Sequence, residues 1–187
     1  MKGLIKRLLR EGLDNCSNLF SDSSDNAHHK VAIHDDLYYY VVKKKRVTLE
    51  YMSPEEFFDE LGGFEYHSKK NIDYDTVAKK VDDINKGIKL DMPYLMYDSY
   101  GNNVGHEGRH RMVAAMKMGC NRAPVMVERN VSEKDVMDLA NKLGDLELDD
   151  MIKELKAMGF KNFDEHYMSR IAYILRASKE KGYLYIP

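Results

Sequence analysis

The chain has 187 residues and is 43% hydrophobic, which suits one domain with a real core and some appended helices. Charged residues make up 32% of the chain, but the formal net charge is only -2. This balance excludes a uniformly basic nucleic-acid-binding protein and leaves only a local patch for such contacts.

The two cysteines, Cys16 and Cys120, lie far apart in the sequence and outside any CxxC pair. Their number and spacing argue against a disulfide scaffold and against a cysteine zinc site, and they favour a reducing, cytoplasmic setting. We therefore expect both cysteines to be dispensable for activity. No apolar run approaches the length of a membrane span, so we expect no membrane-spanning segment.

Residues 1–29 are predicted to form an amphipathic helix followed by a polar linker. Lys2–Leu13 carries apolar residues on one helical side and basic residues on the other. We interpret it as a helix that docks on the protein, with a membrane-surface helix as the alternative. Ser21–His29 is polar and predicts a linker, in which we interpret His28 and His29 as solvated rather than as a weak metal pair.

Residues 30–130 are predicted to form an α/β (α+β) domain with a small mixed sheet and flanking helices. The β-rich runs Leu37–Val42 and Val47–Met52 predict a hairpin or two neighbouring strands. The basic run Lys43–Arg46 between them is interpreted as a solvated turn, and contact with nucleic acid is the alternative.

Helix signals follow these strands. Ser53 and Glu56 match a capping box at the start of a helix that ends near Gly62. Apolar periodicity predicts a second helix over Asp75–Lys86. The remaining elements predicted in this region are a strand at Pro93–Tyr97, a turn at Asp98–Asn103, a helix at Arg109–Met118 and a strand at Ala123–Val127.

Residues 131–187 are predicted to form a C-terminal helical extension. Ser132 and Asp135 form a capping-box pattern at its first helix. Three helices are predicted. The first ends near Leu143, the second spans Asp149–Met158 and the third spans Asp164–Lys181.

The stretch from Gly105 to Arg111, GHEGRHR, has the chemistry of an anion-binding loop. Gly105 and Gly108 allow a backbone to approach a ligand closely. The stretch leads into a predicted helix N-terminus, which offers free N–H groups and the positive end of a dipole. Arg109 and Arg111 are donors suited to phosphate, yet they are unfavourable at a helix start unless an anion binds there.

Around this stretch the chain resembles the ParB/sulfiredoxin family, over residues 47–129. The loop-to-helix junction of that family carries an acidic or small residue, a glycine, a variable residue, a histidine or arginine, and an arginine. A glycine and a Pro-Val strand follow at this interval. The matching residues here are Met52–Phe58 (MSPEEFF), Pro93–Leu95 (PYL), Glu107–Arg111 (EGRHR), Ala114, Ala115, Gly119 and Ala123–Val125 (APV).

The resemblance implies a small α/β fold that binds nucleotide phosphates. Activities in this family include nucleoside-triphosphate binding, sulfinic-acid reduction, small-molecule phosphorylation and nuclease activity, which the fold alone does not separate. Sulfiredoxins carry a cysteine where this chain has Arg109, so their thiol chemistry is not expected here. The three C-terminal helices are short of basic residues and show no clear recognition helix, so a full chromosome-partitioning protein is not expected either.

The expected ligand is therefore a nucleoside triphosphate, with or without Mg²⁺, or the phosphate backbone of DNA. Glu107 is the candidate general base or metal contact, and its alternative role is to cap the following helix. His110 is a second candidate catalytic residue, and both His110 and His106 are candidate phosphate contacts whose alternative is a bond to backbone. Asp98 is either a metal-assisting carboxylate or an ordinary turn residue.

His106–His110 also spells HExxH, the zinc-protease string, which requires both histidines on one continuous helix. The turn-forming residues before His106 and the glycine inside the motif do not favour that helix, so a zinc-dependent hydrolase stays an alternative and no zinc is expected. A binding module without catalysis, which senses a nucleotide or contacts DNA, is a further alternative. The sequence indicates no oligomeric state.

Overall fold

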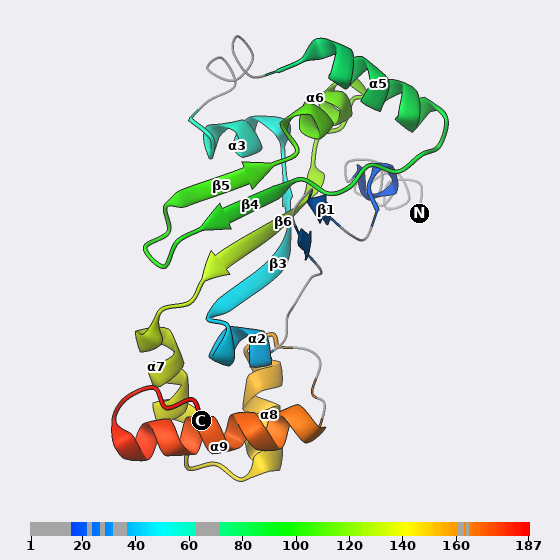
Figure 1. Ribbon diagram of the computed structural model, residues 1–187. Coiled ribbons are helices and arrows are strands. Elements are labelled where there is room, and N and C mark those ends of the chain that lie inside the picture. Colours follow the sequence, from blue (N-terminus) through cyan, green and yellow to red (C-terminus); the bar gives the residue numbers. More distant parts are fainter. Residues whose placement is uncertain are drawn as a thin grey trace, which may run out of the picture. The chain divides into compact units, whose positions relative to one another are not determined.

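The computed structural model describes residues 16–21, 24–26, 29–31, 37–62, 72–160, 163 and 165–187. The predicted N-terminal helix Lys2–Leu13 lies outside these residues. The chain divides into two compact units (Figure 1). The first unit comprises Met1–Ile33, Leu49–Met96 and Asn103–Val127, and the second comprises His34–Thr48, Tyr97–Asn102 and Glu128–Pro187.

A four-stranded mixed sheet has the strand order β3-β6-β4-β5. Its strands are β3 (Lys45–Met52), β4 (Tyr94–Tyr97), β5 (Asn103–Glu107) and β6 (Ala123–Asn130). β6 runs parallel to β4, whereas β3 and β5 run antiparallel to their neighbours (Figure 1). The first six residues of β6 are buried, as its run of apolar residues predicts for a central strand. The expected mixed α/β architecture is confirmed, including the predicted strands at residues 93–97 and 123–127.

A separate two-stranded ribbon pairs β1 (Ser24–Asn26) with β2 (His29–Val31) in antiparallel register, with Ser24 opposite Val31. The prediction of a linker over Ser21–His29 is therefore wrong for the residues that pair. Cross-strand hydrogen bonds form between backbones, so a polar side-chain composition does not prevent them.

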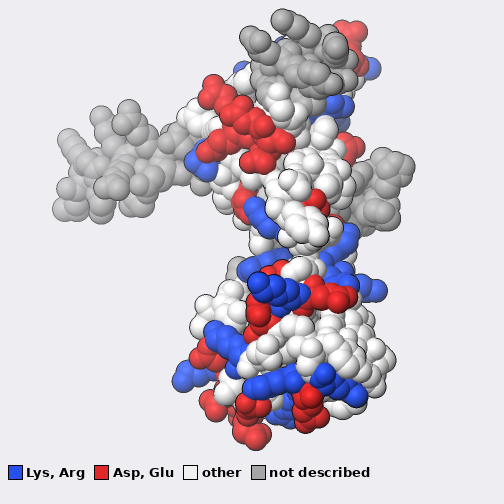
Figure 2. All heavy atoms as spheres, turned by 90° about the vertical axis from the view of Figure 1, so that its left-hand side faces the viewer, with Lys and Arg blue, Asp and Glu red and all other residues white. Residues whose placement is uncertain are grey.

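The helices of the first unit are the 3-10 helix η1 (Cys16–Leu19), α3 (Pro54–Asp59), α5 (Tyr74–Asn85) and α6 (Arg109–Lys117). The predicted capping box at Ser53 is confirmed, because its hydroxyl accepts from the Glu56 N–H and the Glu56 carboxylate accepts from the Ser53 N–H. Both α3 and α5 pack against α6. Figure 2 shows acidic side chains gathered at the level of α3; the exposed acidic residues of this segment are Glu55, Glu56, Asp59 and Glu60.

The second unit is helical around its own core. It contains α2 (Leu37–Val42), α7 (Glu133–Leu143), α8 (Leu148–Ala157) and α9 (Glu165–Lys181). The predicted helices of the C-terminal extension and the capping box between Ser132 and Asp135 are confirmed. No helix in the described part of the chain combines the length and apolarity that crossing a membrane requires.

The prediction of a strand at Leu37–Val42 is wrong, since these residues form α2. Leu37 and Val41 are one helical turn apart, and both are buried in the core formed with α7, α8 and α9. Burial of this face outweighs the β-propensity of the tyrosines and valines, because propensity differences are small compared with core packing.

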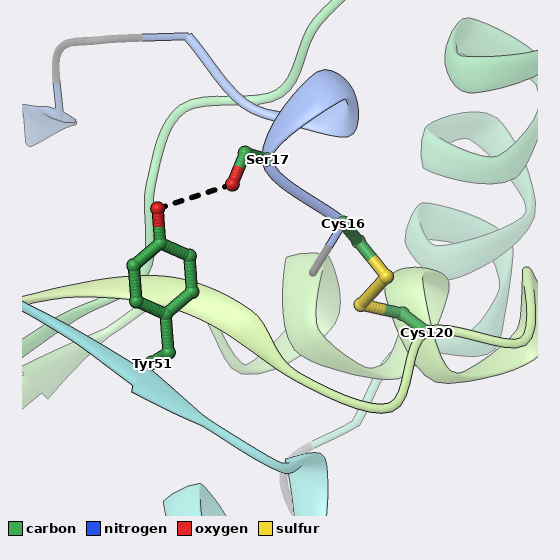
Figure 3. Close-up of a disulfide and its surroundings, with 4 residues drawn as sticks. All are labelled: Cys16, Ser17, Tyr51 and Cys120. Atoms are coloured by element: carbon green, nitrogen blue, oxygen red, sulfur yellow. Dashed lines mark hydrogen bonds between the residues drawn. A yellow bond between two sulfur atoms is a disulfide. The ribbon is translucent and has the colours of Figure 1, made fainter. Parts of the chain in front are cut away.

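Cys16 and Cys120 form a disulfide with their Cα atoms 5.7 Å apart (Figure 3). The expectation that these cysteines are unpaired is therefore wrong. The chain folds η1 onto the turn that follows α6, where the Cys16 N–H donates to the Arg122 carbonyl at 3.0 Å. Ser17 and Tyr51 are joined there by a hydrogen bond of 3.2 Å between their hydroxyls (Figure 3).

Candidate functional site

The junction between β5 and α6 brings together the seven residues predicted as a site. Gly105, His106 and Glu107 lie on β5, Gly108 is the N-cap, and Arg109, His110 and Arg111 form the first turn of α6. The loop between strand and helix is shorter than the sequence predicts, because β5 continues to Glu107 and α6 begins at Arg109.

Backbone packing explains one of the two glycines of the junction, Gly108. Gly108 has a φ of 97°, and a Cβ at this position would lie 2.8 Å from the Cα of Pro93. A Cβ on Gly105 would meet only the side chain of Met96 on the neighbouring strand β4, chiefly its flexible terminal methyl. Gly108 therefore has two functions at the start of α6. It adopts the left-handed backbone conformation of the N-cap, and it lets the N-cap lie close to the backbone of Pro93, directly before β4.

The N-terminus of α6 has no side-chain cap and no acidic residue in its first turn. By contrast, Ser53, Asp73 and Ser132 cap α3, α5 and α7 with their side chains. A helix start without a side-chain cap and with two arginines concentrates positive charge. Glu107, directly before the N-cap, and Asp91 offset part of the Arg111 charge, and the uncapped start remains complementary to an anion.

Arg111 folds back over the start of its own helix. Its Nε lies 3.3 Å from where a Cβ on Gly108 would stand, and its guanidinium donates to the Met92 carbonyl at 3.1 Å. Asp91 forms a looser ion pair with it at 3.9 Å, and the arginine side chain is only 12% exposed. Burial lowers the pKa of Arg111, while Glu107 and Asp91 oppose that shift, so the guanidinium stays charged.

His110 links α6 to the start of α5. Its Nε2 accepts a hydrogen bond of 3.0 Å from the backbone N–H of Asp73, which caps α5. An accepting Nε2 places the ring proton on Nδ1 and requires neutral imidazole. Burial lowers the pKa of His110, and the neighbouring Arg109 lowers it further. His110 is therefore bonded to backbone, which was the alternative to a contact with phosphate.

The HExxH string does not form a helical zinc motif. His106 lies on β5 and His110 on α6, so the two histidines do not share one helix. Within the described residues, no three histidine, cysteine, aspartate or glutamate side chains come together as a metal-ion site. Asp98 serves its turn, where one carboxylate oxygen accepts from the Tyr100 and Asn102 N–H groups at 2.9 Å each. The Asn102 side-chain amide donates to the other carboxylate oxygen at 3.0 Å. This bond has the largest effect in lowering the pKa of Asp98, and the backbone N–H groups lower it further.

The basic run at residues 43–46 is tied into the second unit. Lys44 pairs with Glu133 at 3.1 Å, and Lys45 pairs with the buried Glu128 at 2.5 Å. The Arg46 guanidinium lies 5.4 Å from the centre of the Phe160 ring. The carboxylates of Glu133 and Glu128 therefore partly neutralise the charges of Lys44 and Lys45.

Comparison with known proteins identifies no relative: no family model, no curated protein and no solved structure matches the chain.

Proposed function

We propose that this chain is a nucleotide-phosphate-binding protein of the ParB/sulfiredoxin-like class, with its site at the N-terminus of α6. The observation that carries the proposal is the uncapped start of α6, which holds two arginines and no acidic residue in its first turn. An anion at this point offsets the repulsion between the arginines and the helix dipole.

The ligand group is a phosphate. Its oxygens accept from the N–H groups in the first turn of α6, which has no side-chain cap. Arg109 supplies a guanidinium from the first turn. Arg111 adds its charge from beside Gly108 while it holds the helix start to Met92.

A nucleoside triphosphate is the favoured ligand, and a DNA backbone presents the same phosphate chemistry. Mg²⁺ would arrive with the nucleotide rather than occupy a carboxylate cage, since the described residues form no such cluster. Glu107, the last residue of β5, is the carboxylate that we propose to contact that ion or to act as a base.

A thermal-shift screen of ATP, CTP, GTP and short DNA, with and without Mg²⁺, tests the ligand class, because a ligand that binds only the folded state raises the melting temperature. We expect a nucleoside triphosphate to give the largest shift. The absence of any shift at saturating nucleotide and DNA would contradict the proposal.

Glu107→Gln separates catalysis from binding. If the protein hydrolyses or transfers phosphate, this variant retains nucleotide affinity and loses turnover, measured as phosphate release. Retained binding with no turnover in either protein identifies a binding module without catalysis. The matched control is Glu128→Gln, which changes a carboxylate of the second unit that pairs with Lys45.

A further inference from the structure

A groove of about 260 Å³ lies between the start of α3 and the end of α6. This volume accommodates a small molecule or a single extended side chain, not a folded partner. Cys120 lines the groove, whereas its disulfide partner Cys16 does not. The other lining residues are Ser53, Pro54, Glu55, Met116, Gly119 and Asn121.

The segment that carries Cys16 has non-covalent contacts of its own. The Cys16 N–H donates to the Arg122 carbonyl, and Phe20, only 1% exposed, forms a parallel bridge with Leu90. The Ser21 N–H donates to the Leu90 carbonyl at 2.8 Å. These contacts keep the two sulfurs near each other after reduction, so the disulfide can open and close again without unfolding of the segment.

We propose that this groove is the access route for a small thiol that exchanges with the Cys16–Cys120 disulfide, and that the thiol attacks Sγ of Cys120. Exchange requires the attacking thiolate to approach one sulfur while the other leaves. Both cysteines are buried, Cys16 at 8% and Cys120 at 5% exposure, but only Cys120 lines the groove, so attack from the groove makes Cys16 the leaving group. This inference does not depend on the phosphate site at the other end of α6.

The exchange balances with a dithiol as the reductant. The first thiolate bonds to Cys120 Sγ, and the bond to Cys16 breaks to release the Cys16 thiolate. The second thiolate of the dithiol then attacks its own mixed disulfide and releases Cys120. Two electrons and two protons pass from the dithiol to the cysteines, and the dithiol leaves as a cyclic disulfide.

Charge at the groove selects among thiols. Glu55 lines it and is exposed. A carboxylate at this position repels every attacking thiolate, and it repels more strongly a thiolate that carries additional negative charge. We therefore expect the site to favour uncharged thiols over glutathione, which carries a net negative charge.

Mapping the mixed disulfide in the wild-type protein tests the direction of attack. The oxidised protein is exposed briefly to 2-mercaptoethanol and quenched with acid, and the free thiol is alkylated before peptide mass analysis. We expect mercaptoethanol on Cys120 and the alkyl group on Cys16. An adduct mainly on Cys16, an even distribution, or free thiols in protein purified in air would overturn the proposal.

Single variants give an independent readout. Folded Cys16→Ser leaves Cys120 as the free thiol, and folded Cys120→Ser leaves Cys16. We expect iodoacetamide to modify Cys120 at least about tenfold faster, because access limits thiol reactivity. Equal rates, or a faster Cys16, would count against the groove. Wild-type mapping does not depend on whether these variants fold.

The selectivity is tested by Glu55→Gln. This change should raise the rate of reduction by glutathione relative to 2-mercaptoethanol. The control is Glu60→Gln, which removes a nearby carboxylate that does not line the groove. A rate ratio unchanged by Glu55→Gln, or changed equally by both variants, would contradict the charge selection.

Discussion

Arg111 has a structural role at the β5–α6 junction in addition to its proposed role in binding. Its guanidinium satisfies the Met92 carbonyl, and the side chain is only 12% exposed. We expect Arg111→Ala to lower the free energy of unfolding by about 1–3 kcal/mol, because a partly buried acceptor loses a charged donor. Urea denaturation measures this loss. Lys117→Ala, at the exposed end of the same helix, should cost less, and an equal cost would contradict the structural role of Arg111.

His110 makes stability depend on pH. Its folded-state pKa is lowered from 6.5, so the folded protein resists a proton that the unfolded chain accepts. The stabilising contribution is complete above pH 6.5 and is lost as the pH falls from there through the lowered pKa.

The matched variant is His110→Gln, whose amide oxygen can still accept from Asp73 but does not titrate. Melting temperatures of both proteins are measured between about pH 5 and pH 8. We expect the wild type to lose more stability than the variant on the acid side. Parallel pH profiles would show that His110 contributes no such dependence.

The residue types of the junction were predictable from the sequence, but their partners were not. GHEGRHR correctly placed a glycine and two arginines at a helix start. The partner of Arg111 is a backbone carbonyl 19 residues away, and that of His110 is a backbone N–H 37 residues away. Backbone groups occur at every position and therefore leave no pattern in the sequence.

The start of α6 depends on Gly108 for its positive φ and for its close approach to Pro93. Gly119 serves as a comparison that shares only the positive φ. Both residues have positive φ, but a Cβ on Gly119 would meet nothing within 4 Å, whereas one on Gly108 would approach the Pro93 backbone. We expect Gly119→Ala to cost about 1–2 kcal/mol from backbone conformation alone. Gly108→Ala should cost about 1–3 kcal/mol more, from the clash.

Urea denaturation of the two glycine variants provides the comparison, since a change of midpoint at constant slope reports stability. Similar losses for Gly108→Ala and Gly119→Ala would mean that the contact with Pro93 relaxes without cost.

Local chemistry predicted some elements and failed for others. The capping boxes at Ser53 and Ser132 are signals within four residues, and both are confirmed. The short run Leu37–Val42 fits a strand or a buried helix equally well by periodicity. Its partners, α7, α8 and α9, lie far along the chain, so only the tertiary core decides in favour of a helix.

At the scale of the whole molecule, the disulfide joins residues 104 positions apart. Two isolated cysteines in a sequence do not indicate whether the fold brings them together, so their pairing could not be predicted. A bond that closes a loop of this length is worth about 4.7 kcal/mol in the chain-entropy account, because it restricts the unfolded state.

Reduction should therefore lower the melting temperature by roughly 10 °C for a chain of this size. Calorimetry with and without a strong reductant measures the change. The control is the double variant Cys16→Ser/Cys120→Ser, which should melt near the reduced wild type and should not respond to reductant. A wild-type melting temperature that is insensitive to reductant would contradict a stabilising disulfide.

The central claim is that the N-terminus of α6 binds phosphate. Calorimetric titration of ATP, CTP, GTP and short DNA into the wild type, Arg109→Ala, Arg111→Ala and Lys117→Ala tests it most directly. The titrations are run where circular dichroism shows each variant to be folded. A charged hydrogen bond to phosphate is worth about 1.5–3 kcal/mol, so Arg111→Ala should weaken binding by roughly tenfold to a hundredfold.

We expect Arg109→Ala to weaken binding in the same direction, and Lys117→Ala, at the opposite end of the helix, to leave it unchanged. Equal affinity in all four proteins, for every ligand that binds, would contradict the assignment of the site.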